Sequence, residues 1–159
     1  MGDPSFMDKA VEVGLSGIRK GEGEPFAAVV VRNGEIVGQG TNRITINMDP
    51  TAHGEVEAIR DACKNLGTVY LTGCDLYTTC LPCPMCFGAA HWSDIRTVYY
   101  GADTADATQF GFGGQEEIYK EIKLDIEDGG GKIPFVQVAR TTALKLFEEW
   151  RENEEKGQN

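Results

Sequence analysis

Two short segments carry residue types that could bind a metal ion and use it for chemistry. "HGE" places His53 and Glu55 two residues apart, and "CLPCPMC" contains Cys80, Cys83 and Cys86. Imidazole nitrogen and thiolate sulfur are ligands that zinc prefers. Catalytic zinc sites use three protein ligands and leave the fourth position to water. The two segments together predict a catalytic zinc site with one open position.

The cysteine segment permits two pairs at zinc-ligand spacing, Cys80 with Cys83 or Cys83 with Cys86. Pro84 suits the first turn of a helix that would carry Cys86, whereas Cys80 ends a predicted strand. On one helical turn Cys83 and Cys86 face the same way, and the positive end of the helix favours their thiolate forms. We therefore expect Cys83 and Cys86 to bind one zinc ion per chain together with His53, and Cys80 to be a buried thiol.

Glu55 follows His53 closely enough to lie beside the metal without coordinating it. Zinc lowers the pKa of its bound water towards about 7, so that hydroxide becomes available at neutral pH. A carboxylate beside that water can take its proton and return it to a leaving amine. The predicted chemistry is hydrolytic attack on an aminated ring, with Glu55 as the catalytic acid and base.

Other interpretations of these residues need different ligands. His91, five residues beyond Cys86, could close a structural site with two cysteines and two histidines. A zinc ribbon needs a second pair of ligands, and Cys63 and Cys74 do not have that spacing. A redox pair at Cys83 and Cys86 is a further alternative.

Helices and strands alternate along the chain after an initial hairpin, whose tight turn is predicted at Asn33–Gly34. This order predicts an α/β protein, a three-layer α/β/α sandwich around a mixed five-stranded sheet. The expected helices cover 6–21, 52–67, 84–93 and 141–156, with two helical pieces in 102–122, a loop at 43–51, and strands at 26–31, 36–42, 75–79, 96–101 and 132–139. The first helix should bury Phe6, Ala10, Val13 and Ile18, and the second Val56, Ile59, Ala62 and Leu66.

Length, hydropathy and net charge limit the kinds of partner and location that we expect for the protein. The 159 residues suit a single domain, 1–159, and no apolar run is long enough for a membrane helix. With 15 basic and 25 acidic residues the net charge is −10, which argues against a nucleic-acid partner and favours a small molecule. The N-terminal residues do not form a secretory signal, and the clustered cysteines suit a reducing compartment, so the cytoplasm is the expected location.

The motif H-x-E…P-C-x-x-C is the signature of zinc nucleobase deaminases, and it stands here at 53–55 and 82–86. The chain resembles the cytidine-deaminase-like superfamily, and within it the small guanine deaminases and the plant guanosine deaminases. The likeness extends over "DPTAHGEVEAIRDACKNLG", "PCPMCFGAAHW" and "GF…IYKEI…IPFVQV". It implies the cytidine deaminase-like fold and a zinc-dependent amidine hydrolase.

The resemblance also implies contacts with the substrate. Asn42 would hydrogen-bond the ring, Phe26 and Trp92 would pack against it, and the backbone at Gly54 and Cys83 would help to hold a carbonyl group and the zinc water. Ordinary packing is the alternative for Phe26 and Trp92. An acidic pair after "GF" serves such guanine deaminases as a second proton shuttle, and here Glu116 or Glu117 are the candidates.

At some positions this sequence differs from the residues that are usual in guanine deaminases. Gly54 replaces the usual Ala, Leu81 replaces the usual Glu, and an aromatic residue that closes the site is missing from "EEKGQN". We therefore expect guanine as the substrate, with guanosine, cytosine, creatinine or an aminotriazine such as ammeline as alternatives. A tRNA adenosine deaminase and a zinc scaffold without activity are further alternatives. The resemblance implies a homodimer, and the C-terminal segment 141–159 is a candidate for exchange between chains.

Overall fold

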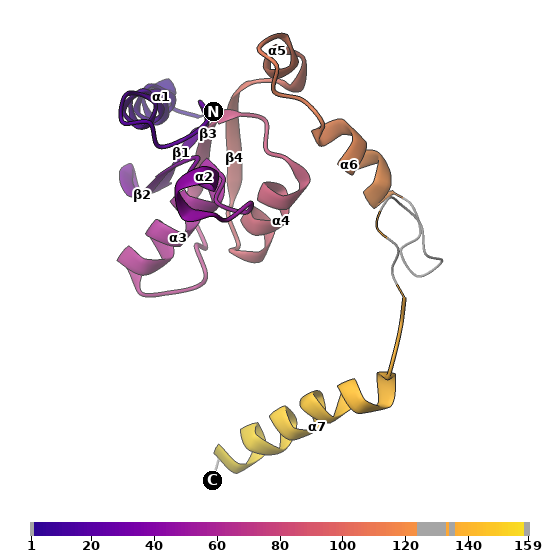
Figure 1. The fold of residues 1–159 in the computed structure, drawn as a ribbon. Coiled ribbons are helices and arrows are strands. Elements are labelled where there is room, and N and C mark those ends of the chain that lie inside the picture. Colours follow the sequence, from indigo (N-terminus) through magenta and orange to yellow (C-terminus); the bar gives the residue numbers. More distant parts are fainter. Residues whose placement is uncertain (1, 124–132, 134–135, 158–159) are drawn as a thin grey trace. The chain divides into compact units, whose positions relative to one another are not determined.

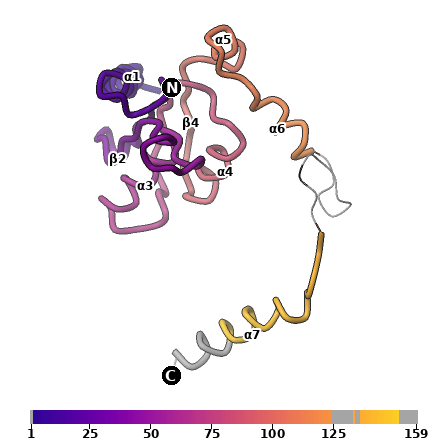
Figure 2. Tube along the Cα trace, in the orientation of Figure 1, coloured from indigo at the N-terminus to yellow at the C-terminus, as the bar shows by residue number. Residues whose placement is uncertain are grey.

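The computed structural model describes residues 2–123, 133 and 136–157, apart from the side chains of 152–157. The chain divides into two compact units, one ending at Glu116 and one beginning at Glu117. The helices are α1 (Pro4–Arg19), α2 (Ile44–Asn47), α3 (Gly54–Leu66), α4 (Pro84–Trp92), α5 (Thr104–Gln109), α6 (Gln115–Ile122) and α7 (Arg140–Gly157). The strands are β1 (Ala27–Arg32), β2 (Glu35–Thr41), β3 (Asp75–Cys80) and β4 (Thr97–Ala102). Figures 1 and 2 show this order along the chain.

A mixed sheet forms the centre of the first unit. Its strand order is β2-β1-β3-β4; β1 runs antiparallel to both neighbours, and β3 runs parallel to β4. The hairpin between β1 and β2 turns at Asn33 and Gly34, both with positive φ (52° and 82°), as a tight two-residue turn requires. The parallel pair brings the carboxyl ends of β3 and β4 to one edge, and α4 begins just beyond β3.

Helices cover both faces of this sheet (Figure 1). Alternate residues of β1 point to opposite faces, as the two-residue period of a strand dictates. Ala28 and Val30 pack in one cluster with residues of α3 and α4, and Val29 and Val31 pack in the other with residues of α1. The predicted three-layer sandwich is confirmed.

The prediction of which α1 residues are buried was partly wrong. Ala10 is buried as expected, but Ile18 is 46% exposed, and Gly14 and Gly17 are buried in its place. Residues 10, 14 and 17 follow one another at helical spacing, so this narrow, small-residue face rests on the sheet and Ile18 falls outside it.

Two further expectations need correction. The predicted loop at 43–51 contains the short helix α2, which ends at Met48 in the left-handed region. The sheet has four strands among the described residues, not five. Of the predicted strand at 132–139, residues 132, 134 and 135 lie outside the described residues, and 133 and 136–139 are not in a strand. Alternating apolar residues satisfy the pattern of a strand, but a strand also needs a neighbour to pair its backbone groups.

The two helical pieces expected in 102–122 are present as α5 and α6, and the closing helix is present as α7. On α7, Leu146, Phe147 and Trp150 expose 74%, 72% and 67% of their surface. Among the described residues no helix combines the length and the apolar composition needed to cross a membrane.

Candidate functional site

Two helix N-termini position the three predicted zinc ligands. His53 is the N-cap residue of α3 and Cys83 is the N-cap residue of α4, while Cys86 lies in the first turn of α4, which begins with Pro84 as expected. The Cys83 Sγ atom lies 3.8 Å from His53 Nδ1 and 3.6 Å from Cys86 Sγ. All three donor atoms lie within 4.8 Å of one another. Ligands from sequence positions thirty residues apart therefore meet at one point.

The spacing of the donor atoms fits a tetrahedral zinc ion. Zinc bonds of about 2.3 Å to sulfur and about 2.0 Å to nitrogen place neighbouring donors about 3.5–3.8 Å apart. One imidazole and two thiols supply three ligands and leave the fourth position open. Cys80 does not belong to this group: it is buried, and its thiol donates to the carbonyl oxygen of Asp103. The choice of Cys83 and Cys86 over Cys80 agrees with this geometry.

The two cysteines of the group shift each other's pKa in opposite directions. The hydrogen bond between Cys83 and Cys86 lowers the pKa of Cys83 to about 4, and His53 acts in the same direction. The same bond, with burial and the nearby Glu55, raises the pKa of Cys86 far above its usual range. Hydrogen bonding to the Cys83 sulfur raises the pKa of His53 against the opposing effect of burial. The thiolate form is therefore favoured at Cys83 and the thiol form at Cys86, and a divalent cation bound by both would displace the Cys86 proton.

Glu55 lies in the first turn of α3 and is only 6% exposed. Its Oε2 atom accepts a hydrogen bond from the Cys86 thiol at 3.5 Å. Burial raises the pKa of this carboxyl group, as expected where water cannot solvate the charge. A carboxylate with a raised pKa beside a metal ligand is suited to carrying a proton, which is the role the sequence predicted.

Asn42, Phe26 and Gly54 lie together. The backbone N–H of Asn42 donates to the carbonyl oxygen of Phe26 at 2.9 Å, and Asn42 is 2% exposed. A Cβ atom at Gly54 would lie 3.0 Å from the same carbonyl oxygen and 2.9 Å from the Cα of Ala27. The start of α3 therefore rests directly on the segment that enters β1.

Phe26 packs edge-on against Phe112, with ring centroids 5.1 Å apart. The two rings line a cavity of about 300 Å³ at the carboxyl ends of β3 and β4, together with Cys80 and Phe110. Phe112 was not predicted as a partner of Phe26. The sequence points only to the acidic residues that follow the "GF" segment, and an isolated Phe beside glycines gives no periodic signal.

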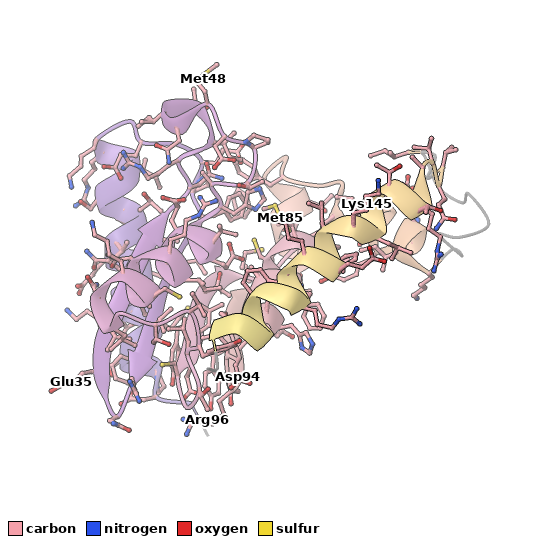
Figure 3. The ribbon with its side chains drawn as sticks, turned by 90° about the horizontal axis from the view of Figure 1, so that it is seen from below. Glu35, Met48, Met85, Asp94, Arg96 and Lys145 are labelled. Atoms are coloured by element: carbon pink, nitrogen blue, oxygen red, sulfur yellow. The ribbon has the colours of Figure 1, made fainter. Side chains whose placement is uncertain are left out.

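The structure leaves three predicted site residues exposed. Trp92 ends α4 and is 85% exposed. Glu116 and Glu117 lie in the first turn of α6, exposed, and Glu117 pairs with Lys120 at 3.0 Å. Met48, between Asn42 and His53 in the chain, is 86% exposed and points outward (Figure 3). The roles of Trp92, Glu116 and Glu117 stay predictions.

Known proteins share the sequence pattern and the fold. Residues 2–102 match the family described as "Cytidine and deoxycytidylate deaminase zinc-binding region". A guanine deaminase of Bacillus subtilis is 46% identical over 151 residues, which is 95% of each chain. An X-ray structure of guanine deaminase from Bacillus subtilis superposes with a TM-score of 0.87 at 45% identity, covering 96% of this chain and 95% of that one. A tRNA-specific adenosine deaminase of Aquifex aeolicus is 41% identical over 102 residues, 64% of this chain and 67% of its own.

Proposed function

The chain belongs to the cytidine and deoxycytidylate deaminase zinc-binding family, and from this premise we propose that it converts guanine and water to xanthine and ammonia. The main support for guanine is identity of 46% over nearly the whole length of a guanine deaminase. The support for hydrolysis is Glu55, which is buried beside the three candidate zinc ligands but is not one of them.

The zinc ligands and Glu55 have separate roles in the proposed reaction. A zinc ion held by His53, Cys83 and Cys86 would supply Lewis acidity, which lowers the pKa of water at its open position towards about 7. Glu55 takes a proton from the attacking water and passes it to the amino group on C2 of guanine, which departs as ammonia. Its burial keeps it in a site of low dielectric, where it holds a proton more readily than a carboxyl group in water.

The substrate contacts come from the segments around β1 and α3. Asn42 hydrogen-bonds the ring, Phe26 packs against its face, and the backbone at Gly54 and Cys83 holds the polar edge of the ring near the zinc site. The support is that Asn42 and Gly54 both lie against the Phe26 carbonyl group. Trp92 is exposed, as expected of a ring that contacts a ligand rather than the core.

A second proton shuttle is assigned to Glu116 or Glu117. Both carboxylates are exposed at the start of α6 and follow the Phe112 that contacts Phe26. Separate substitutions to Gln identify which of them acts: the effective one lowers kcat for guanine, and the other leaves it unchanged. Equal, unaltered rates in both variants would remove this part of the proposal.

A homodimer is the proposed assembly. The described residues of α7 expose Leu146, Phe147 and Trp150, and α4 exposes Phe87 and Trp92. Large apolar and aromatic side chains of this kind are typical of interfaces. We assign α7, within the segment 141–159, to contacts with a second copy of the chain.

Adenosine deamination in tRNA is the second candidate, because a tRNA-specific adenosine deaminase shares 41% identity over 102 residues. The net charge of −10 opposes binding to a polyanion. The deciding experiment measures ammonia release by the zinc-loaded protein from guanine, guanosine, cytosine, adenine, creatinine and ammeline, and inosine formation in tRNA. Turnover of guanine alone supports the proposal, and turnover of another ring or of tRNA with none of guanine refutes it.

A further inference from the structure

Two glutamates of the loop between α1 and β1 contact successive residues at the end of β2. Glu22 accepts a hydrogen bond from the Thr41 hydroxyl at 2.9 Å and pairs with Arg43 at 3.2 Å. Glu24 Oε2 lies 3.5 Å from Nδ2 of Asn42, the residue between them. Because neighbouring residues of an extended segment face opposite ways, Glu22 and Glu24 hold opposite sides of the same stretch.

The hydrogen bonds of Asn42 define which way its amide points. Its Oδ1 atom accepts from the backbone N–H of Ile44 at 3.3 Å, and its Nδ2 group faces the Glu24 carboxylate. A carboxylate can only accept, so reversing the amide would set two acceptors against each other and place a donor against the Ile44 N–H. Glu24 and Ile44 therefore select one of the two amide orientations. One Nδ2 hydrogen faces Glu24, and the amide carries a second.

The loop lies directly on Asn42. A Cβ atom at Gly23 would lie 2.4 Å from the Asn42 carbonyl oxygen and 2.9 Å from its Oδ1. The charge of Glu24 also reaches the metal site, where it adds to the effects of Cys83 and Glu55 that raise the pKa of His53. Glu24 thus lies against the proposed ring contact, and its charge acts on a proposed zinc ligand.

We propose that Glu24 is a positioning residue for the substrate: it fixes the Asn42 amide so that its second N–H faces the bound ring and donates to an acceptor atom. This inference rests on the proposed function and adds a rule for specificity. The site should prefer rings that present a carbonyl oxygen or an unprotonated ring nitrogen at that point. Without Glu24 only the Ile44 N–H still favours this orientation, so the amide turns over more readily and presents its oxygen, which repels such an acceptor.

An exposed glutamate in a loop can also be no more than a solvated charge. The Glu24 side chain is exposed, so this alternative makes a definite prediction: removing its carboxylate would leave the KM for guanine and the orientation of the Asn42 amide unchanged. The matched control is Glu22→Gln, which removes the same charge from the same loop but touches Thr41 and Arg43 instead of Asn42.

The kinetic experiment compares Glu24→Ala, Glu24→Gln and Glu22→Gln as full-length, zinc-loaded proteins. For Glu24→Ala we expect the KM for guanine to rise about tenfold while kcat changes less than about twofold, the size expected for loss of one hydrogen bond to a charged group. Glu24→Gln should recover part of the loss, because its amide oxygen can still accept from Asn42. Glu22→Gln should keep the wild-type KM. An unchanged KM in Glu24→Ala, or an equal rise in Glu22→Gln, overturns the proposal.

A second measurement does not depend on turnover. The side-chain NH₂ group of Asn42 gives a pair of NMR signals that Asn42→Ala identifies by their loss. In Glu24→Ala both signals should move and lose protection from exchange with water, and in Glu22→Gln they should stay in place. Unmoved signals in Glu24→Ala overturn the positioning role even if guanine is the substrate. If the wild-type protein releases no ammonia from guanine while these signals respond as expected, the proposed substrate fails and the orienting contact stands.

Discussion

The carboxylate of Glu55 accepts a hydrogen bond from the thiol of Cys86 at 3.5 Å, so the proposed proton carrier touches a proposed zinc ligand. When Cys86 binds zinc it must lose the thiol proton that it donates to Glu55. Metal binding therefore frees the Glu55 carboxylate at the same time as it completes the ligand set. The contact explains how a buried acid can be placed beside the metal without being one of its ligands.

Zinc affinity should depend on pH with a definite sign. The pKa of Cys83 is lowered to about 4 and the pKa values of Cys86 and His53 are raised, so near neutral pH zinc must displace the Cys86 proton and any proton on His53. Affinity should rise about tenfold for each pH unit and for each proton released. Competition with a chelator at pH 7.0, 7.5 and 8.0 measures this slope, and calorimetry in two buffers of different ionisation enthalpy counts the protons. A flat affinity over this range would contradict the assigned protonation states.

Removal of zinc should lower stability as well as activity. The ligands come from the starts of α3 and α4, so the metal joins two helices that pack on the same face of the sheet. A ligand that binds only the folded state adds to the free energy of unfolding, by about 4 kcal/mol at a thousandfold excess over its Kd. His53→Ala and Cys86→Ser should lose zinc and melt at the temperature of the chelated wild-type protein. Cys80→Ser, outside the ligand set, should keep full zinc content.

Gly54→Ala should destabilise the protein. The added methyl group would lie 2.9 Å from the Cα of Ala27 and 3.0 Å from the carbonyl oxygen of Phe26, both backbone atoms that cannot swing aside. Forcing one carbon into a filled space costs about 1–3 kcal/mol. Denaturant unfolding measures this loss, with Gly88→Ala as the control because the space beside Gly88 is open. Equal stability of the two variants would show that the backbone at the start of α3 can shift to accommodate the added methyl group at little cost.

The assembly is tested in solution. Light scattering at micromolar concentration should give twice the chain mass of 17.3 kDa. Phe147→Glu together with Trp150→Glu should reduce the mass to that of one chain, because two charges then replace exposed apolar anchors of α7. Lys145→Glu, a charge change on the same helix, is the matched control (Figure 3 shows Lys145). A wild-type monomer would refute the proposed dimer.

Residue spacing was enough to predict the zinc donor set and the layers of the fold. His53 and Cys83 each precede a helix that the sequence predicts. An apolar period indicates the helix after His53, and Pro84 indicates the start of the helix after Cys83, so both donors are expected at helix N-termini. The alternation of β1 likewise predicts a sheet covered on both faces.

Other features depend on contacts between distant segments. The link from Glu24 to Asn42 joins residues eighteen positions apart, and neither "GEGEP" nor "GTN" indicates the other. Ile18 satisfies the helical period but lies beyond a contact face made of Ala10, Gly14 and Gly17. The strand predicted at 132–139 has the apolar pattern of a strand, while strand formation also depends on an available pairing edge, which no local pattern specifies.

Ammonia release by Glu55→Gln decides whether this site deaminates guanine with Glu55 as the proton carrier. The amide keeps the shape of the side chain and cannot accept the proton of the attacking water. We predict that wild-type protein releases ammonia from guanine, and that Glu55→Gln retains its zinc while kcat falls about 10²–10⁴-fold. Wild-type turnover of guanine that persists unchanged in zinc-loaded Glu55→Gln would contradict the account.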